Sequence, residues 1–460
     1  MKEKRTGKKD RKLLWGTIII SMILSLMVFY VLYNANNKYM TREEKAIHGI
    51  LYADGSYDSL PVYYLSREWE YYPDVLLTPG DDLEKYYFRY LSIGEYGGME
   101  LDARNGKPYG SGTYRLRIML PSEEHTYGLY LPEIFSAYNL YVDGKLIEQV
   151  GNPDPDHYEE RIQHRMFTFK GHTSVEIMIA VTDKDSASPG IQYVPAFGNP
   201  LKVNTVRGIP VFLNSSVFTL VLLVLIFSVW EFFSTRSRAN ALFAGVCVCV
   251  LGYTCYPLLH TYLALRVQPW FSLEMLFYYL TFPAMLLLEH EITGRKYKWV
   301  WWLVGFTAAA GIGATVAGIF AGGMETAALF YGVSAVTEVL KWFTAICLVV
   351  IAFFYTEGTR GLPLLAGTVL YASSLAADRI WPLYDPIIGG WFPEWGGTIL
   401  AGVFGVILCR ELTDGYRMRL IYEEQSRQME LRLMMQKEHY EKLTGALEEA
   451  SRTRHDMRQY

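Results

Sequence analysis

Long apolar runs alternate with polar segments along this chain. The first run covers residues 13–33, and seven more follow a polar region, at roughly 209–233, 240–262, 271–291, 298–320, 327–355, 361–384 and 394–411. A helix of about 20 apolar residues spans the hydrocarbon core of a bilayer. The pattern therefore predicts eight membrane-spanning helices, and it excludes a soluble cytoplasmic enzyme.

Positive charge predicts the orientation of these spans. Seven of the first twelve residues are basic, and the run at 13–33 is too long for the apolar part of a signal peptide, so we expect an uncleaved signal anchor; a processed signal with a cleavage site near Ala35 is the alternative. Every second connection between the spans carries Arg or Lys. Examples are Arg236 and Arg238, Arg360, and the basic residues of the tail after Arg410. The positive-inside rule then places both termini in the cytoplasm and residues 34–206 outside, in a multi-pass protein of the plasma membrane.

The polar region between the first two runs has the pattern of antiparallel β-structure. Apolar residues recur at every second position in TYRLRIML (113–120) and in SVEIMIAV (174–181), which is the period of a half-buried strand. Asp143-Gly144 predicts a hairpin turn, and Lys170-Gly171 predicts a second one. With no long amphipathic helix between them, these strands favour a β-sandwich of the jelly-roll type.

These predictions divide the chain into five parts. They are a basic cytoplasmic N-terminus (1–12), a transmembrane anchor (13–33), an extracellular β-sandwich sensor domain (34–206), a seven-helix transmembrane bundle (207–411) and a cytoplasmic helix (412–460).

Composition agrees with this division and narrows the function. Hydrophobic residues make up 51% of the 460 residues and charged residues only 20%. The net charge of −4 excludes a strongly basic nucleic-acid binder. All five cysteines lie in apolar runs, so residues 34–206 have neither a disulfide nor a cysteine-ligated zinc, and we expect no metal site.

Ionisable residues inside the predicted spans need an explanation, because a charge at membrane depth costs at least about 2.5 kcal/mol. Glu338 and Lys341 are three residues apart, so they share a helix face and can form an ion pair. Glu274, Asp378 and Arg379 also fall within apolar runs. Two interpretations stay open: a polar contact between helices that holds or switches the bundle, and an ion or proton pathway.

The tail after Arg410 has the pattern of a coiled coil. Residues recur with spacings of four and three at Met429, Leu433, Gln436, Tyr440, Leu443, Leu447 and Ala450, and all of them except Gln436 are largely apolar. Such a heptad seam on one helix predicts a partner helix, most simply a second copy; a single solvated helix is the alternative. The seam leads to His455, whose imidazole can accept a phosphoryl group, and to Asp456, a carboxylate that can orient it.

The region from Gly110 to Gly151 (GSGTYRLRIMLPSEEHTYGLYLPEIFSAYNLYVDGKLIEQVG) resembles the outer domain of bacterial seven-transmembrane receptors with diverse intracellular signalling modules. That family joins a galactose-binding-like jelly roll to seven helices and a cytoplasmic output domain. The resemblance implies an extracellular ligand of carbohydrate type. His157, Tyr158 and Arg165 in the loop GNPDPDHYEERIQHR are then candidate contacts, although a solvated surface loop explains them equally.

Arg454-His455-Asp456-Met457-Arg458 is similar to the R-H-D-x-R-H box of sensor histidine kinases that carry a GHKL-type ATPase domain. The resemblance implies that His455 is the phosphoacceptor, that Asp456 is its acid/base partner, and that the phosphoryl group passes to a response regulator. Gln459 departs from the usual His. No nucleotide-binding segment follows, so ATP and Mg²⁺ are implied only for a catalytic domain outside this chain, and no cofactor is expected within it.

The leading hypothesis is the sensory part of a two-component system. An extracellular ligand would act through seven helices on a dimeric histidine-kinase helix. The alternative is a receptor or partner subunit without a kinase domain, either as a fragment of a longer chain or natively short. A transporter is a third interpretation, based only on the charges within the spans.

Overall fold

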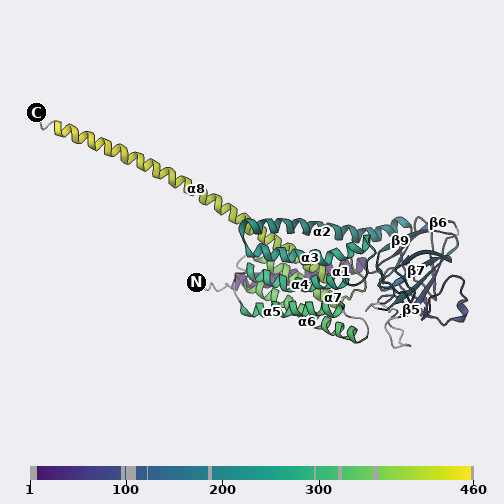
Figure 1. The fold of residues 1–460 in the computed structure, drawn as a ribbon. Helices are drawn as coiled ribbons and strands as arrows, with labels where there is room; N and C mark the ends of the chain where they lie inside the picture. Colours follow the sequence, from purple (N-terminus) through teal and green to yellow (C-terminus); the bar gives the residue numbers. More distant parts are fainter. Residues whose placement is uncertain are drawn as a thin grey trace. The chain divides into compact units, whose positions relative to one another are not determined.

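The computed structural model describes residues 8–94, 99, 110–121, 123–184, 189–294, 297–319, 324–355 and 361–456. It divides into two units, Met1–Phe404 and Gly405–Tyr460, which are treated separately below. In the first unit the β-strands form one group and the helices another (Figure 1).

The strands form a β-sandwich of two sheets. The larger sheet has the order β4-β3-β5-β10-β7-β8, and β1 pairs in parallel with the last residues of β5. The smaller sheet has the order β2-β11-β6-β9. The other pairings are antiparallel. The strands are β1 (Ile50–Tyr52), β2 (Tyr63–Tyr64), β3 (Trp69–Pro73), β4 (Arg89–Leu91), β5 (Gly110–Met119), β6 (His125–Leu131), β7 (Ala137–Val142), β8 (Lys145–Val150), β9 (Arg165–Gly171), β10 (Ser174–Asp183) and β11 (Ala196–Gly198).

The period of two seen in the sequence is the period of burial in the second half of β5, whereas β10 is buried on both faces from Ile177 to Asp183. Tyr114, Leu116 and Ile118 of β5 are fully buried, and the apolar positions of β10 lie beside them in the sandwich core. Asp143 and Gly144 both have positive φ, as a two-residue turn between twisted antiparallel strands requires, and they join β7 to β8.

The second predicted hairpin is wrong. β9 pairs with β6 in the smaller sheet, whereas β10 pairs with β5 and β7 in the larger one. Lys170 and Gly171 lie within β9, and the chain crosses between sheets at the next two residues. A ten-residue apolar strand gains more by pairing on both edges in the centre of a sheet than by pairing with its neighbour in sequence, and the local turn pattern does not report this choice.

Each predicted apolar run lies in a long helix. The helices are α1 (Lys8–Asn36), α2 (Pro200–Thr235), α3 (Arg238–Tyr262), α4 (Trp270–Ile292), α5 (Lys298–Ile319), α6 (Met324–Tyr355), α7 (Leu362–Ile380) and α8 (Phe392–Asp456). In the described part of the chain, seven of them are long and apolar enough to cross a membrane: α1 to α6 and α8. These helices indicate a multi-pass membrane protein.

Helix α2 begins earlier than its apolar run suggests. Its cap is Asn199, whose side chain accepts a hydrogen bond from the Leu201 N–H at 3.0 Å, and Pro210 lies inside the helix. Nζ of Lys202 donates to the carbonyl oxygens of Asp58 and Leu60 at 3.0 and 2.7 Å. The segment 201–210, which contains the predicted boundary between the sandwich and the bundle, is therefore helical and is joined to the sandwich by hydrogen bonds.

Helix α1 packs as a member of the bundle. Phe29 lies edge-on to Phe392 with ring centroids 5.0 Å apart, and Tyr30 and Tyr33 contact Trp381. Beyond the helix, Lys38 forms an ion pair with Asp385 at 3.7 Å. The first helix is thus tied to the connection between α7 and α8.

The second unit is the continuation of α8. Its helix is unbroken to Asp456, and its side chains are exposed from Glu411 to Ser451 except at Leu412, which is half-exposed. The large apolar side chains of the heptad seam, at Met429, Leu433, Tyr440, Leu443 and Leu447, are all among the exposed ones. An exposed apolar stripe on an isolated helix lacks the burial that stabilises such helices.

Candidate functional site

A cavity of about 610 Å³ lies where the sandwich meets the ends of six helices. The sandwich contributes the segment after β6, the segment before β9 and the segment before β11. The helices contribute the end of α1, the first turns of α2, the last turns of α3, the start of α4, the end of α5, and the α7–α8 connection with the first turn of α8. This volume lies within the range of about 300–1,000 Å³ that small-molecule sites occupy.

A loop of the sandwich fixes one wall of the cavity. The backbones of Ile162 and Leu265 exchange two hydrogen bonds, of 2.7 and 3.2 Å, as a short β-bridge to the α3–α4 connection. The backbone N–H of His164 donates to the carbonyl oxygen of His260 at 3.1 Å. Glu160, from the same loop, accepts the backbone N–H of Val267 at 3.2 Å. These backbone contacts hold the sandwich against α3 and α4.

The opposite wall is formed by the α7–α8 connection. Nδ2 of Asn214, on α2, donates to the carbonyl oxygen of Gly389 at 3.0 Å. Glu394, in the first turn of α8, accepts the backbone N–H of Trp391 at 3.0 Å, so its carboxylate caps the helix that becomes the tail. The cavity wall thus includes the residues that define the beginning of α8.

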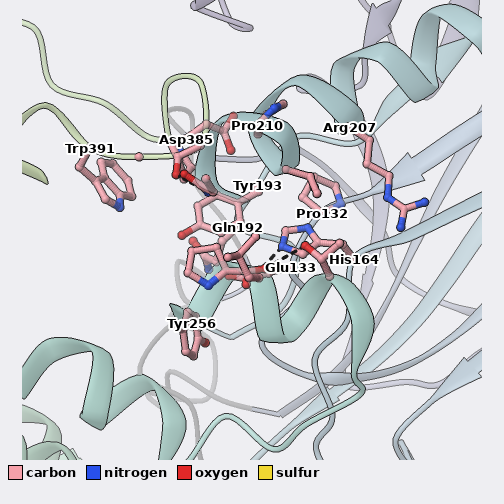
Figure 2. A pocket seen from close by; sticks show the side chains of 18 of the residues that line it. Pro132, Glu133, His164, Gln192, Tyr193, Arg207, Pro210, Tyr256, Asp385 and Trp391 are labelled. Atoms are coloured by element: carbon pink, nitrogen blue, oxygen red, sulfur yellow. Dashed lines mark hydrogen bonds and ion pairs between the residues drawn. The ribbon is translucent and has the colours of Figure 1, made fainter. Parts of the chain in front are cut away.

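Inside the cavity, Glu133, His164 and Tyr130 form a hydrogen-bonded chain. Oε1 of Glu133 lies 3.4 Å from Nε2 of His164 (Figure 2). The Tyr130 hydroxyl lies 2.9 Å from Nδ1 of the same ring. Burial, and secondarily the Glu133 carboxylate, raise the pKa of Tyr130, so its hydroxyl stays neutral where it hydrogen-bonds to Nδ1. Glu133 and Tyr130 thus contact the two ring nitrogens of His164 from opposite sides of the imidazole.

Tyr193 occupies the middle of the cavity, between Asp385 on one side and the Glu133–His164 pair on the other (Figure 2). Burial raises the pKa of Tyr193 well above its usual value, and nearby carboxylates, chiefly Glu133 and Asp385, raise it further. Its phenol therefore stays neutral at physiological pH and offers a hydrogen-bond donor. Burial also raises the pKa of Asp385, although Lys38 acts in the opposite direction.

The candidate carbohydrate residues lie apart from this cavity. The His157 side chain is exposed and its Nδ1 lies 2.9 Å from Oδ2 of Asp154. Tyr158 is half-buried, and Arg165 lies 3.6 Å from Glu148 on β8. The loop that carries them does reach the cavity, but through Glu160 and His164. A role of the three residues in sugar binding stays a prediction.

The charges within the helices form a second group. Nζ of Lys341 lies 2.6 Å from Oε1 of Glu338 and 6.0 Å from the centre of the Tyr278 ring. The Lys341 side chain is only 5% exposed, whereas that of Glu338 is 53% exposed. Asp378, on α7, is close enough to interact electrostatically with Lys341, Glu338 and its neighbour Arg379. The group joins α4, α6 and α7.

His455 and Asp456 lie in the last turn of α8 as the structure describes it; Met457 and Arg458 are outside the described residues. Local sequence patterns do not predict the cavity, because its lining residues come from distant segments. Only Glu274 stood out, as a carboxylate within an apolar run.

Comparisons with known proteins give a limited result. No protein-family model matches the chain, and no curated protein does. Solved structures that resemble part of it include a GH2 beta-galacturonidase from Eisenbergiella tayi bound to galacturonate, at 12% identity and a TM-score of 0.23, over 30% of this chain and 24% of that one. Beta-glucuronidase 2 of Bacteroides uniformis is 14% identical with a TM-score of 0.22, over 30% and 18%.

A β-glucuronidase from Ruminococcus gnavus is 12% identical with a TM-score of 0.22, and the match covers 30% of each chain. This chain therefore spans less than a third of the length of these glycosidases. The similarity is confined to a part of each molecule and carries no argument about ligand or activity.

Proposed function

We propose that this protein is a membrane receptor in which a ligand bound in the cavity controls the arrangement of the cytoplasmic tail. The observation that carries the proposal is the composition of the cavity wall, which joins the sandwich to the residues that begin α8. Since α8 is one helix from Phe392 to Asp456, a rotation or shift at its first turn can be passed along the helix to the tail.

The finer topology belongs to the same proposal. The sandwich is a jelly roll outside the cell, α1 is an uncleaved anchor, all eight helices cross the membrane, and both termini are cytoplasmic. The alternation of positive connections supports this orientation. The carbohydrate contacts at His157, Tyr158 and Arg165 are a second, separate expectation for the sandwich surface.

The tail acts as a homodimeric signalling helix in this proposal. Its exposed seam has the spacing of a parallel coiled coil, and a second copy covers it. His455 then accepts a phosphoryl group from an ATPase domain and passes it to a response regulator. The resemblance of Arg454-His455-Asp456 to the histidine-kinase box supports this step.

Cross-linking tests the dimer and the coupling together. The five native cysteines are replaced by Ser, and Cys is introduced at Leu443 on the seam or, as a control, at Glu441 on another face. We expect Leu443→Cys to cross-link about tenfold faster in membranes, because thiols on facing seam positions have a high effective concentration. Equal rates at the two positions would contradict the dimer.

Coupling is tested by filling the cavity. Met275 lines it, whereas Leu273, two residues earlier on α4 and equally half-buried, does not. Met275→Trp should change the cross-linking rate of Leu443→Cys by about twofold or more, because the larger side chain fills the cavity as a bound ligand would. Leu273→Trp should leave the rate unchanged. An unchanged rate in Met275→Trp would contradict the proposed coupling between the cavity and the tail.

Phosphoryl transfer is tested with a separate GHKL-type ATPase domain and radiolabelled ATP. Label should appear on the chain, disappear in His455→Gln and persist in His439→Gln, a matched histidine on the same helix. Labelling that persists in His455→Gln would refute the phosphoacceptor assignment. A chain that is never labelled would favour the receptor without a kinase partner.

A further inference from the structure

The cavity is rich in carboxylates. Five acidic side chains line it against two permanent cations and one histidine. The acidic ones are Glu133, Glu160, Glu274, Asp385 and Glu394, and the others are Lys38, Arg207 and His164. An excess of anionic groups around an enclosed volume favours a cationic occupant, because charge without a counter-ion is costly away from bulk water.

Four of the five carboxylates have partners from the protein. Lys38 forms an ion pair with Asp385, and His164 contacts Glu133. Backbone N–H groups serve Glu160 and Glu394. Glu274, on the first turns of α4, has neither a hydrogen bond nor an ion pair with any residue that the structure describes.

Arg207 does not compensate for Glu274. Figure 2 shows the Arg207 side chain directed away from Tyr193 and Asp385, toward the sandwich. Arg207 forms no ion pair within the described ranges of the chain. The two permanent cations of the lining are therefore either already paired or turned away.

Aromatic rings surround the same end of the cavity. Phe271, one turn before Glu274 on α4, packs against Phe135 and Tyr256, each with ring centroids 6.2 Å apart, and Phe135 in turn contacts Tyr193 at 5.9 Å. Tyr256 is only 5% exposed, and its hydroxyl has no hydrogen-bond partner in the described structure. A buried hydroxyl without a partner costs free energy unless a ligand or water satisfies it.

We propose that the cavity binds an organic ammonium ion, with its charge opposite Glu274 and its carbon substituents against Phe271, Tyr256 and Tyr193. Aromatic faces attract ammonium groups, and a carboxylate adds charge without requiring the ligand to donate hydrogen bonds. The Tyr256 hydroxyl pairs with a polar atom on the remainder of the ligand. This inference rests on the proposed receptor function, for which it names the ligand class.

The test uses two probes of equal shape. Acetylcholine carries a quaternary ammonium, and 3,3-dimethylbutyl acetate has carbon in place of the nitrogen and no charge. Binding of each to the full chain in lipid nanodiscs is measured by titration calorimetry. We expect the ammonium probe to bind at least about tenfold more tightly, as desolvated cation–aromatic and ionic contacts imply.

Variants assign this preference to the cavity. Glu274→Gln should reduce the ratio of the two dissociation constants to about one, because the side chain keeps its shape and loses its charge. Glu291→Gln, the same change at an exposed position about 25 Å further along α4, should leave the ratio unaltered. Tyr256→Phe should weaken both probes equally.

Three results would overturn the inference: equal binding of the probes to the unmodified chain, no binding of acetylcholine up to millimolar concentrations, and an ammonium preference that survives Glu274→Gln. The first two need no variant and hold even if Glu274→Gln fails to fold. If the ammonium preference is absent while Met275→Trp still alters cross-linking of the tail, only the ligand class fails. If the preference is present and the cross-linking is unaltered, only the receptor function fails.

Discussion

The two groups of charges in this molecule differ in how they are satisfied. Glu338 and Lys341 lie on one helix, three residues apart, and their charged atoms are 2.6 Å from each other. In the cavity the charged side chains come from the sandwich and from several helices, and Glu274 lacks a partner among the described residues. The first group is complete within the protein, whereas the second leaves one charge for something else.

The difference separates a structural role from a binding role. A buried charge with a protein partner holds elements in register, and its removal destabilises the fold. A carboxyl group that faces a cavity without a protein partner contributes little to stability in the empty state, and it can gain a partner when a cationic ligand binds. Stability and binding should therefore respond in opposite ways to substitutions in the two groups.

The largest effect is expected at the pair within the helices. Glu338→Leu leaves the buried ammonium of Lys341 without its nearest partner and should lower the free energy of unfolding by about 3 kcal/mol. Adding Lys341→Met should restore most of the loss, since neither charge then remains. Unfolding in mixed detergent micelles measures both. If Glu338→Leu alone is as stable as the unmodified chain, Asp378 is a sufficient partner for the Lys341 ammonium.

Local spacing explains why one group was predicted and the other was not. Residues three apart on a helix share a face whatever the tertiary structure, so the sequence alone indicates the Glu338–Lys341 pair. Likewise, the alternation in β5 predicts its buried face, and Asp143-Gly144 predicts its turn, whereas β10 is buried on both faces because it pairs in the centre of the larger sheet.

The cavity depends on which distant segments meet. Glu160 and His164 reach it because Ile162 pairs with Leu265, a contact between residues about 100 positions apart in the sequence. Nothing in the local pattern of either segment reports that pairing. The misassigned hairpin at Lys170-Gly171 has the same origin, because the choice between sheets is made by remote partners.

An intermediate effect is expected for the aromatic wall of the cavity. Phe271→Ala removes a ring that contacts Phe135 on the sandwich side and Tyr256 on α3, and should lower the free energy of unfolding by about 2 kcal/mol. This is less than for a fully enclosed Phe, because one side of the ring already borders the cavity. Phe271→Leu, which keeps apolar contact, should recover about half. A loss equal to that of a fully packed core Phe would indicate that the cavity is closed at this point.

A smaller, pH-dependent effect is expected at Asp385. Burial raises the pKa of this carboxyl from its usual value of 3.8, and the ion pair with Lys38 offsets only part of the increase. The folded protein therefore keeps the proton to a higher pH than the unfolded chain does, so this group's stabilising contribution is lost as pH rises through the folded pKa. Asp385→Asn should flatten the dependence of unfolding free energy on pH above 4. A steeper dependence would show that the Lys38 pair dominates.

The smallest effect on stability is expected at Glu274, and it defines the contrast with Glu338. Glu274→Gln replaces a carboxyl group that has no hydrogen-bond or ion-pair partner among the described residues, so no partner is left behind in the cavity. The free energy of unfolding should then stay within about 0.5 kcal/mol of the unmodified chain, or rise slightly, because a neutral amide of the same shape is no costlier to bury than a carboxyl group without a partner. The same micelle unfolding experiment that detects the loss in Glu338→Leu measures it. A loss as large as that of Glu338→Leu would mean that Glu274 is satisfied within the fold, and the cavity would then have no charge to offer a ligand.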